Sequence, residues 1–350
     1  MSSFDFHKYP QEYILDFIDF LDDPLKADLE LFCLGRTVNR NRLTNRMKEF
    51  LLSLSPSGLI KSPENSSFSM HPLCVYLVDG IIYFADIPNA MMNVYYGTDS
   101  LALLRRLHIG FTHGIRFLDL CGGAGIQGLI AAKSGAKVEN VEISPISSNI
   151  SLYNSTFNNL NHNYSIINVS LETFFSNWNG HEYNRIVANP PLVPIPDEFA
   201  YNMSGHGGLD GLKITRLILS FVPRMLSHRG CCTLIGMCGG NEDGPEILDI
   251  ADSVVIDSQY SATLCVFSSS EISSNSFWIN YLTSSLTSYG HENIDKHSLV
   301  DIYKSNNISK IFSYSLDITR DKGCFDRIAP SLQLINFPAY YSLSDGWWIY

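Results

Sequence analysis

From about residue 115 onward, short apolar runs alternate with helical segments, and this alternation constrains the fold more than any other feature of the chain. The runs are candidate strands, at residues 115–120, 137–143, 164–170, 184–190, 231–237 and 253–258. Candidate helices fit between them, at residues 126–133, 147–158 and 212–226. Buried-type strands that alternate with helices are typical of a parallel sheet covered on both faces. We therefore predict an α/β fold with a doubly wound sheet.

The regions on either side of this alternation read differently. A chain of 350 residues suits two folding units. Helical spacing of apolar residues between about 10 and 60, followed by β-like runs at 74–80 and 81–87, predicts a smaller helical, winged-helix-like domain. We place this accessory domain at residues 1–90 and the α/β domain at 91–350. Later β-like runs predict a β-rich C-terminal extension that finishes the sheet, at residues 262–269, 277–282 and 310–318.

The charge balance restricts the partners of the chain. Acidic residues outnumber basic ones by 35 to 24, which gives a formal net charge of −11. Proteins hold a nucleic-acid backbone with Lys and Arg side chains that neutralise phosphates. The balance therefore weighs against a large RNA or DNA substrate and favours a small molecule or a peptide. We interpret the small arginine cluster from Arg36 to Arg46 as a solvated helix face.

Other sequence features predict where the protein works. The first residues lack the pattern of a secretory signal, and no apolar run approaches the length that crosses a bilayer. We expect a soluble, cytoplasmic protein with no membrane partner. The eight cysteines lack the spacing of zinc or redox motifs, so no metal site is predicted.

The first motif that carries chemistry is a glycine-rich turn at residues 117–128 (FLDLCGGAGIQG), where an apolar run leads directly into a helix. Glycine allows a sharp turn and a close approach of backbone to ligand because it lacks a Cβ. A helix N-terminus also presents free N–H groups to polar ligand atoms. By itself this motif fits either a nucleotide-binding turn or an ordinary tight turn.

The second motif is an acidic residue about twenty positions beyond the glycine turn. Glu142 ends the next candidate strand, and Glu139 is the competing position nearby. A carboxylate at this place can accept hydrogen bonds from both hydroxyls of a ribose. Nicotinamide enzymes and methyltransferases share this arrangement, so the cofactor stays open at this point.

The third motif is Asn189-Pro190-Pro191 at the carboxyl end of the fourth candidate strand, the edge where open α/β sheets bind ligands. Proline restricts the residue before it, so Asn189 and its carbonyl are held in one orientation. The Asn189 side chain and the Pro190 carbonyl offer two acceptors to an N–H₂ group. Holding these hydrogens aims the nitrogen lone pair at an electrophilic methyl group. The competing interpretation is a simple Asn-Pro-Pro turn.

Together the three motifs resemble the class I S-adenosylmethionine-dependent methyltransferases that carry an Asn-Pro-Pro signature. This group includes the glutamine methyltransferases of release factors and RNA base N-methyltransferases. Residues 204–212 (SGHGGLDGL) are similar to a stretch after the signature in the release-factor group, and residues 96–100 (YGTDS) to an element of the RNA adenine group. The resemblance covers about residues 90–240. It implies a Rossmann-like methyltransferase sheet, S-adenosyl-L-methionine as cofactor, and methylation of nitrogen.

The resemblance also implies roles for individual residues. Those on the cofactor side are Asp119, Gly122 and Gly125 at the methionine end, Glu142 at the ribose, Ser170 or Glu172 near adenine, and Thr98 and Asp99 as closure of the pocket. Those on the acceptor side are Asn189 and Pro190, which hold the target nitrogen, with Asn189 also beside the cofactor, and Pro191, Leu192 and His206 near the substrate.

Two positions depart from the family pattern. The family usually has an aromatic residue after Asn-Pro-Pro, whose ring stacks on a flat base or amide, and this chain has Leu192. The departure weakens the case for a flipped nucleic-acid base, which such enzymes hold partly by stacking. The usual Asp after the third strand is replaced by Ser170, which puts the adenine contact in doubt.

We therefore predict an N-methyltransferase that acts on an amide or amine of a small molecule, amino acid or peptide. An RNA or DNA base N-methyltransferase is the first alternative, favoured by the winged-helix-like N-terminus and the arginine cluster. A non-catalytic, cofactor-binding partner protein is the second, and the intact Asn-Pro-Pro argues against it.

Overall fold

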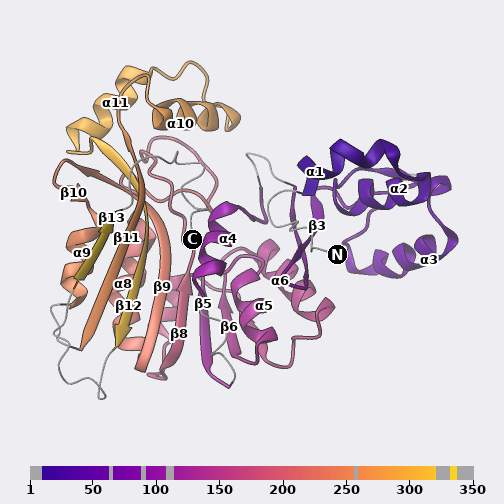
Figure 1. Ribbon diagram of the computed structural model, residues 1–350, viewed down its shortest axis with the longest axis horizontal. Helices are drawn as coiled ribbons and strands as arrows, with labels where there is room; N and C mark the ends of the chain where they lie inside the picture. The colour runs from indigo at the N-terminus through magenta and orange to yellow at the C-terminus, as the bar shows by residue number, and fades with distance from the viewer. Residues whose placement is uncertain are drawn as a thin grey trace.

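One sheet organises most of the chain. The computed structural model describes residues 10–62, 66–87, 92–107, 114–255, 259–320 and 332–336. Within these residues, nine strands form this sheet, with eight in the order β13-β11-β12-β9-β8-β5-β6-β7 and β10 paired to β9 (Figure 1). The strands are β5 (Arg116–Leu120), β6 (Lys137–Val141), β7 (Tyr164–Ile167), β8 (Tyr183–Ala188), β9 (Leu226–Asn241), β10 (Gly244–Pro245), β11 (Tyr260–Glu271), β12 (Lys310–Arg320) and β13 (Leu332–Asn336).

The sheet is mostly parallel, and helices cover both of its faces. Strands β7, β6, β5, β8 and β9 are parallel, whereas β12 runs antiparallel to β9 and β11 antiparallel to β12. Side chains alternate along a strand, so Phe117 packs in one hydrophobic cluster and Leu118 in the other. The covering helices are α4 (Thr98–Arg106), α5 (Ile126–Lys133) and α6 (Pro145–Phe157) on the first face, and α7 (Leu171–Ser176), α8 (Lys213–Met225) and α9 (Ile247–Val255) on the second. The doubly wound α/β prediction is confirmed.

Two predicted strands are wrong. In the predicted strand 253–258, residues up to Val255 belong to helix α9, and 256–258 lie outside the described residues. Buried Ile247, Ala251 and Val254 share one face of α9, so helical packing outweighs the β-branched composition. Residues 277–282 begin helix α10 (Phe277–Ser288) instead of a strand. The Ser276 side chain accepts a hydrogen bond from the Ile279 N–H, which caps this helix.

The C-terminal extension completes the sheet, with a helical lobe inserted between two strands. β11, β12 and β13 continue the sheet beyond β9, as predicted for the tail. Between β11 and β12 the chain forms α10 and α11 (Lys296–Ser305), which stand above the carboxyl end of the sheet (Figure 1). The extension is therefore only partly β-rich.

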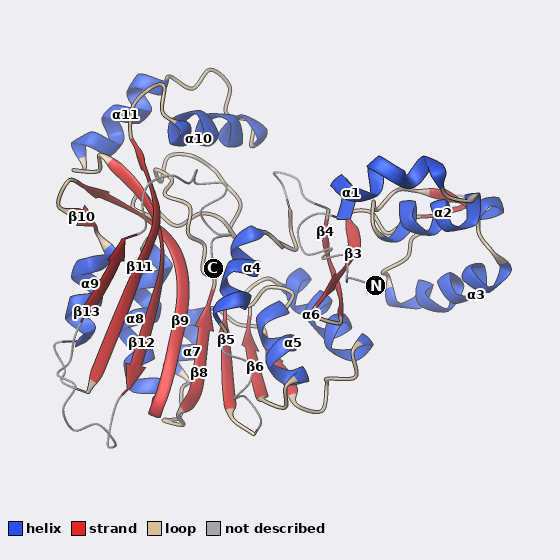
Figure 2. Ribbon diagram, in the orientation of Figure 1, coloured by secondary structure: helices blue, strands red, loops and turns tan. Residues whose placement is uncertain are grey.

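The N-terminal part contains short helices and two small hairpin-like ladders (Figure 2). Its elements are α1 (Pro10–Phe17), η1 (Ile18–Phe20), α2 (Asp23–Phe32), β1 (Val38–Asn39), η2 (Arg40–Arg42), α3 (Asn45–Leu54), η3 (Ser55–Ser57), β2 (Ser67–Phe68), β3 (Leu73–Val78) and β4 (Ile81–Asp86). The predicted boundary between residues 90 and 91 lies outside the described residues. None of the helices described is long and apolar enough to cross a membrane.

The arginine cluster is not the predicted helix face. Within the span from Arg36 to Arg46, only the last two residues belong to an α-helix. The Arg42 guanidinium contacts the Asp23 carboxylate at 2.8 Å and the buried Glu30 carboxylate at 2.5 Å. Arginine offers several donors in a fixed fork, so the cluster serves to hold this loop to helix α2.

Two asparagines of α6 join the N-terminal hairpin to the α/β domain. Asn154 is fully buried; its Oδ1 accepts from the Phe84 N–H at 2.8 Å, and its Nδ2 donates to the carbonyls of Phe84 and Ala124. One turn later, Asn158 makes the same paired contact with the backbone of Ile82 at the exposed surface. The two amides thus extend the hydrogen-bond ladder of β4, and a single hydrophobic cluster spans the junction.

We expect Asn154→Ala to lower the free energy of unfolding by about 3 kcal/mol, because three buried backbone groups lose their partners. The matched change Asn158→Ala exposes its partners to water and should cost about 1 kcal/mol. Urea unfolding of both variants measures the difference. Equal losses would contradict a buried anchor at Asn154.

Candidate active site

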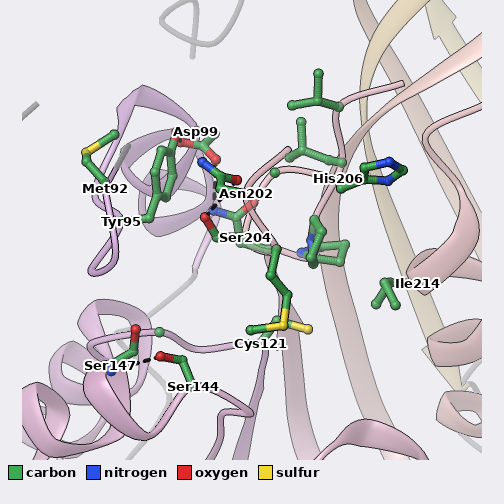
Figure 3. Close-up of a pocket in the computed structure, with 18 of the residues that line it drawn as sticks. Met92, Tyr95, Asp99, Cys121, Ser144, Ser147, Asn202, Ser204, His206 and Ile214 are labelled. Atoms are coloured by element: carbon green, nitrogen blue, oxygen red, sulfur yellow. Dashed lines mark hydrogen bonds between the residues drawn. The ribbon is translucent and has the colours of Figure 1, made fainter. Parts of the chain in front are cut away.

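A cavity of about 1080 Å³ opens at the carboxyl-end edge of the sheet. Segments that follow β5, β6 and β8 form its wall, together with residues near α4, the loop 201–206 and one side of α10. Figure 3 shows Tyr95 and Asp99 on one side of this space and His206 and Ile214 on another, with Cys121 between them. The cavity therefore lies where an open α/β sheet binds its ligands.

The glycine turn takes the predicted strand–turn–helix form. A Cβ on Gly122 would overlap Asn140 Oδ1, and Gly125 has a φ of +92° and no room for a Cβ beside the Tyr164 hydroxyl. Gly123, at a φ of +57°, faces open space, and both Gly122 and Gly123 line the cavity. The requirement for glycine thus comes from close packing behind the turn as well as from backbone conformation.

Asp119 lies beneath the turn, not on the cavity wall. It is 1% exposed, and its Oδ2 accepts a hydrogen bond from the Gly128 N–H at 2.9 Å. Burial raises the pKa of this carboxyl to about 7. Asp119 therefore fixes the first turn of α5 against β5.

This pKa predicts a pH-dependent stability. The folded state keeps a proton on Asp119 up to about pH 7, whereas the unfolded chain releases it near the ordinary value of 3.8, so stability falls as pH rises between these values. The loss amounts to about 4 kcal/mol, at about 1.36 kcal/mol per pKa unit. Urea unfolding at pH 5 and pH 7.5 should show a smaller difference for Asp119→Asn than for the wild type. Equal differences would contradict this assignment.

Glu142 is the acidic residue that reaches the cavity. Its carboxylate accepts from the Gly123 N–H at 2.9 Å and the Ser144 N–H at 2.7 Å, and burial raises its pKa. Glu139 points elsewhere: it accepts from the Tyr183 hydroxyl at 2.7 Å and pairs with Arg116. Of the two candidates, only Glu142 can meet a ligand in the cavity.

Ser170 does not line the cavity. Its hydroxyl oxygen accepts from the Thr173 N–H at 3.2 Å and caps helix α7. Its neighbours Val169, Leu171 and Glu172 do line the cavity.

Asn189 carries the most distinctive feature of the cavity wall. Its Nδ2 donates to Asp99 Oδ2 at 3.0 Å, and this fixes the orientation of the amide. Its Oδ1 is buried and has no hydrogen-bond partner among the residues described. Most buried polar atoms are paired, so this acceptor is available to a ligand. Pro190, Pro191 and the buried Leu192 line the same cavity.

Asp99 is held in place from its other side by a residue that the sequence did not indicate. The Tyr95 hydroxyl donates to Asp99 Oδ1 at 2.6 Å, and both residues line the cavity. Burial raises the pKa of Asp99, and the bonds from Tyr95 and Asn189 oppose this shift. Thr98, at the first position of α4, is absent from the wall. Tyr95 carries no motif of its own, so only the fold reveals it.

His206 lines the cavity, and its Nδ1 accepts from the Gly208 N–H at 3.2 Å. The nearby Asp210 accepts a hydrogen bond from the Leu212 N–H, just before α8, and pairs with Arg216. The Gly-rich stretch therefore shapes the loop between Leu192 and α8.

The wall formed by α10 was also missed, because its residues were assigned to a strand. Its contributions to the cavity are Phe277, Asn280, Tyr281, Ser284, Ser285 and Ser288. The capping Ser276 was the available sequence signal for a helix here.

Comparison with known proteins finds a family match in the central part of the chain. Residues 95–198 match the family model of the methyltransferase small domain. This segment is a methyltransferase domain. It contains the glycine turn, Glu142 and Asn189, and its cofactor is S-adenosylmethionine. The chain is accordingly a methyltransferase enzyme, as the sequence predicts.

The chain is also similar to solved structures of methyltransferases. One is the SAM-dependent methyltransferase from Agrobacterium tumefaciens, with 13% identity, a TM-score of 0.45 and coverage of 73% of this chain and 72% of that chain. Another is the T. thermophilus 16S rRNA N2 G1207 methyltransferase in complex with AdoMet and guanosine, with 12% identity, a TM-score of 0.41 and coverage of 82% and 64%.

The cavity wall of the methyltransferase domain fits the cofactor chemically. The Glu142 carboxylate supplies acceptors for ribose hydroxyls, and Gly122 and Gly123 let backbone approach the ligand. Ile143, Val169 and Leu171 supply apolar surface for a flat base. Among the described residues, no group of His, Cys, Asp and Glu side chains is arranged to hold a metal ion.

Proposed function

We propose that the protein is an N-methyltransferase in which Asn189 and Pro190 hold an amide or amine nitrogen of a small molecule, amino acid or peptide. The observation that carries this proposal is the buried, unpartnered Oδ1 of Asn189. A buried acceptor without a partner costs about 1–3 kcal/mol. An N–H of the acceptor molecule would remove this cost when it binds.

The side chains around Asn189 explain how the nitrogen would be oriented. The Asp99 carboxylate accepts a hydrogen bond from Asn189 Nδ2, so the amide directs its nitrogen toward Asp99 and leaves its oxygen available to a ligand. The Pro190 carbonyl would accept the second hydrogen of the N–H₂ group. With both hydrogens held, the lone pair has one direction left, and such positioning can supply several kcal/mol of rate enhancement.

The reaction balances without a strong base. When bound, S-adenosylmethionine would supply an electrophilic methyl group on its sulfonium sulfur, and the sulfur would keep the electrons of the broken S–CH₃ bond as a neutral thioether. The acceptor nitrogen forms the new N–C bond with its lone pair and then releases one of the protons held at Asn189 or Pro190. The residues of this chain bind and orient the acceptor nitrogen, and water or a neighbouring group takes the released proton.

The charges of the wall favour a small or peptide acceptor over nucleic acid. Among the described wall residues, Lys213 is the only Lys or Arg, whereas Asp99, Glu142 and Glu172 carry carboxyl groups. A phosphate backbone would meet few cations there.

The test uses cofactor labelled with ¹³C in the transferred methyl group. The full chain is incubated with small-molecule, protein and RNA fractions of a cell extract, and products are examined by ¹H–¹³C NMR. We expect an N–CH₃ signal in the small-molecule or peptide fraction. A methyl group on oxygen, sulfur or carbon would overturn the proposal, and N–CH₃ in RNA alone would identify a base methyltransferase instead.

A further inference from the structure

The lobe of α10 and α11 is tied to the loop that follows Asn-Pro-Pro. The hydroxyls of Tyr201 and Ser285 lie 2.8 Å apart, and Asn202 Nδ2 donates to the Tyr289 hydroxyl at 2.6 Å. The rings of Tyr201 and Tyr289 pack with centroids 4.5 Å apart. The inserted lobe and the loop 201–206 therefore form one wall of the cavity.

Helix α10 presents two aromatic rings to the cavity. Phe277 and Tyr281 lie one helical turn apart on α10, and both line the cavity. They remain 48% and 47% exposed, although large apolar side chains are usually buried. Their rings are nearly parallel, at 13°, with centroids 6.3 Å apart. Buried Trp278 and Leu282 anchor the adjacent face of α10, so the two rings have a firm base.

The surroundings of these rings are polar, and they include the Lys296 ammonium, which donates to Asn280 Oδ1 at 2.6 Å. Asn280, Ser284, Ser285 and Ser288 continue the α10 side of the cavity. Leu192, next to the Asn-Pro-Pro turn, brings no ring to the nitrogen-binding side. An aromatic face beside hydrogen-bonding groups favours a flat ligand, because flat rings gain from offset stacking with aromatic side chains.

We propose that Phe277 and Tyr281 form a stacking surface for the methyl acceptor, and that this acceptor is a small molecule whose amide or amine group is carried by a flat aromatic ring. The inference rests on the proposed function, since Asn189 holds the nitrogen while the α10 rings hold the acceptor. It assigns specificity to a helix outside the segment that matches the methyltransferase small domain.

The test compares two probes that share a carboxamide but differ in the flatness of the ring, benzamide and cyclohexanecarboxamide. Dissociation constants are measured by ligand-observed NMR on the full chain saturated with S-adenosylhomocysteine. We expect benzamide to bind at least fivefold more tightly. In Phe277→Leu/Tyr281→Leu, which keeps apolar volume but removes both flat faces, this preference should disappear. The control Phe50→Leu changes a comparably exposed ring on α3 and should keep the preference.

Equal binding of the two probes, no binding of benzamide at millimolar concentration, or an unchanged preference in the double variant would overturn the inference. The alternative outcome is that a short single-stranded RNA binds at least a hundredfold more tightly than benzamide and loses this tighter binding in the double variant. That result would overturn the inference that the acceptor is a small molecule. Thermal unfolding verifies that the variants are folded. Binding of the two probes is measured without methyl transfer. A failed N–CH₃ experiment would therefore count against the proposed function, whereas only the binding data decide the ring preference.

Discussion

Replacing Asn189 with alanine is expected to lower the rate of methyl transfer about 10³-fold while the affinity for S-adenosylhomocysteine changes by about threefold or less. Precise positioning and preorganised hydrogen bonds contribute effects of this size. The variant removes the unpartnered Oδ1 acceptor and also the Nδ2 donor that satisfies Asp99. Rates are measured as label transferred to the extract fraction that contains the acceptor, and affinities by calorimetry.

Asn184→Ala is the matched control for this prediction. Asn184 lies near the other end of β8, where its Oδ1 accepts from the Arg116 N–H and its Nδ2 donates to Ser227. Its loss should reduce stability modestly and leave the transfer rate close to that of the wild type. If Asn189→Ala retained the wild-type rate, the proposed positioning mechanism would be wrong.

Glu142→Ala is expected to weaken binding of S-adenosylhomocysteine at least about a hundredfold. A carboxylate that accepts two ribose hydroxyls makes charge-assisted hydrogen bonds of about 1.5–3 kcal/mol each. The variant also frees the N–H groups of Gly123 and Ser144, which the carboxylate now holds at the cavity wall. Titration calorimetry gives the dissociation constants.

The control here is Glu139→Ala, which lies within β6 three residues before Glu142 and is directed toward Tyr183 and Arg116. We expect it to bind S-adenosylhomocysteine as the wild type does. Thermal unfolding of both variants separates a loss of binding from a loss of structure. Equal affinities of the two variants would contradict the assignment of Glu142 to the ribose.

Local patterns predicted the centre of the fold well. The helix at residues 126–133 coincides with α5, and the strands at 116–120 and 137–141 fall within the predicted runs, because glycine turns and apolar runs delimit them sharply. The errors at α9 and α10 share one cause: short apolar runs rich in β-branched and aromatic residues fit a strand or a buried helix equally well. Packing against the sheet decided between them.

The sequence alone determined the strand–turn–helix around Gly122, the position of Glu142 after β6 and the stiff Asn-Pro-Pro turn, because glycine, proline and strand ends act within a few residues of chain. Only the tertiary structure decided which groups face the cavity. It placed Asp119 and Ser170 behind the wall, supplied Tyr95 to support Asp99, and brought the rings of α10 to the same space. Contacts between segments up to 90 residues apart, such as Asn189 with Asp99, depend on the packing of the whole sheet, and no local pattern encodes them.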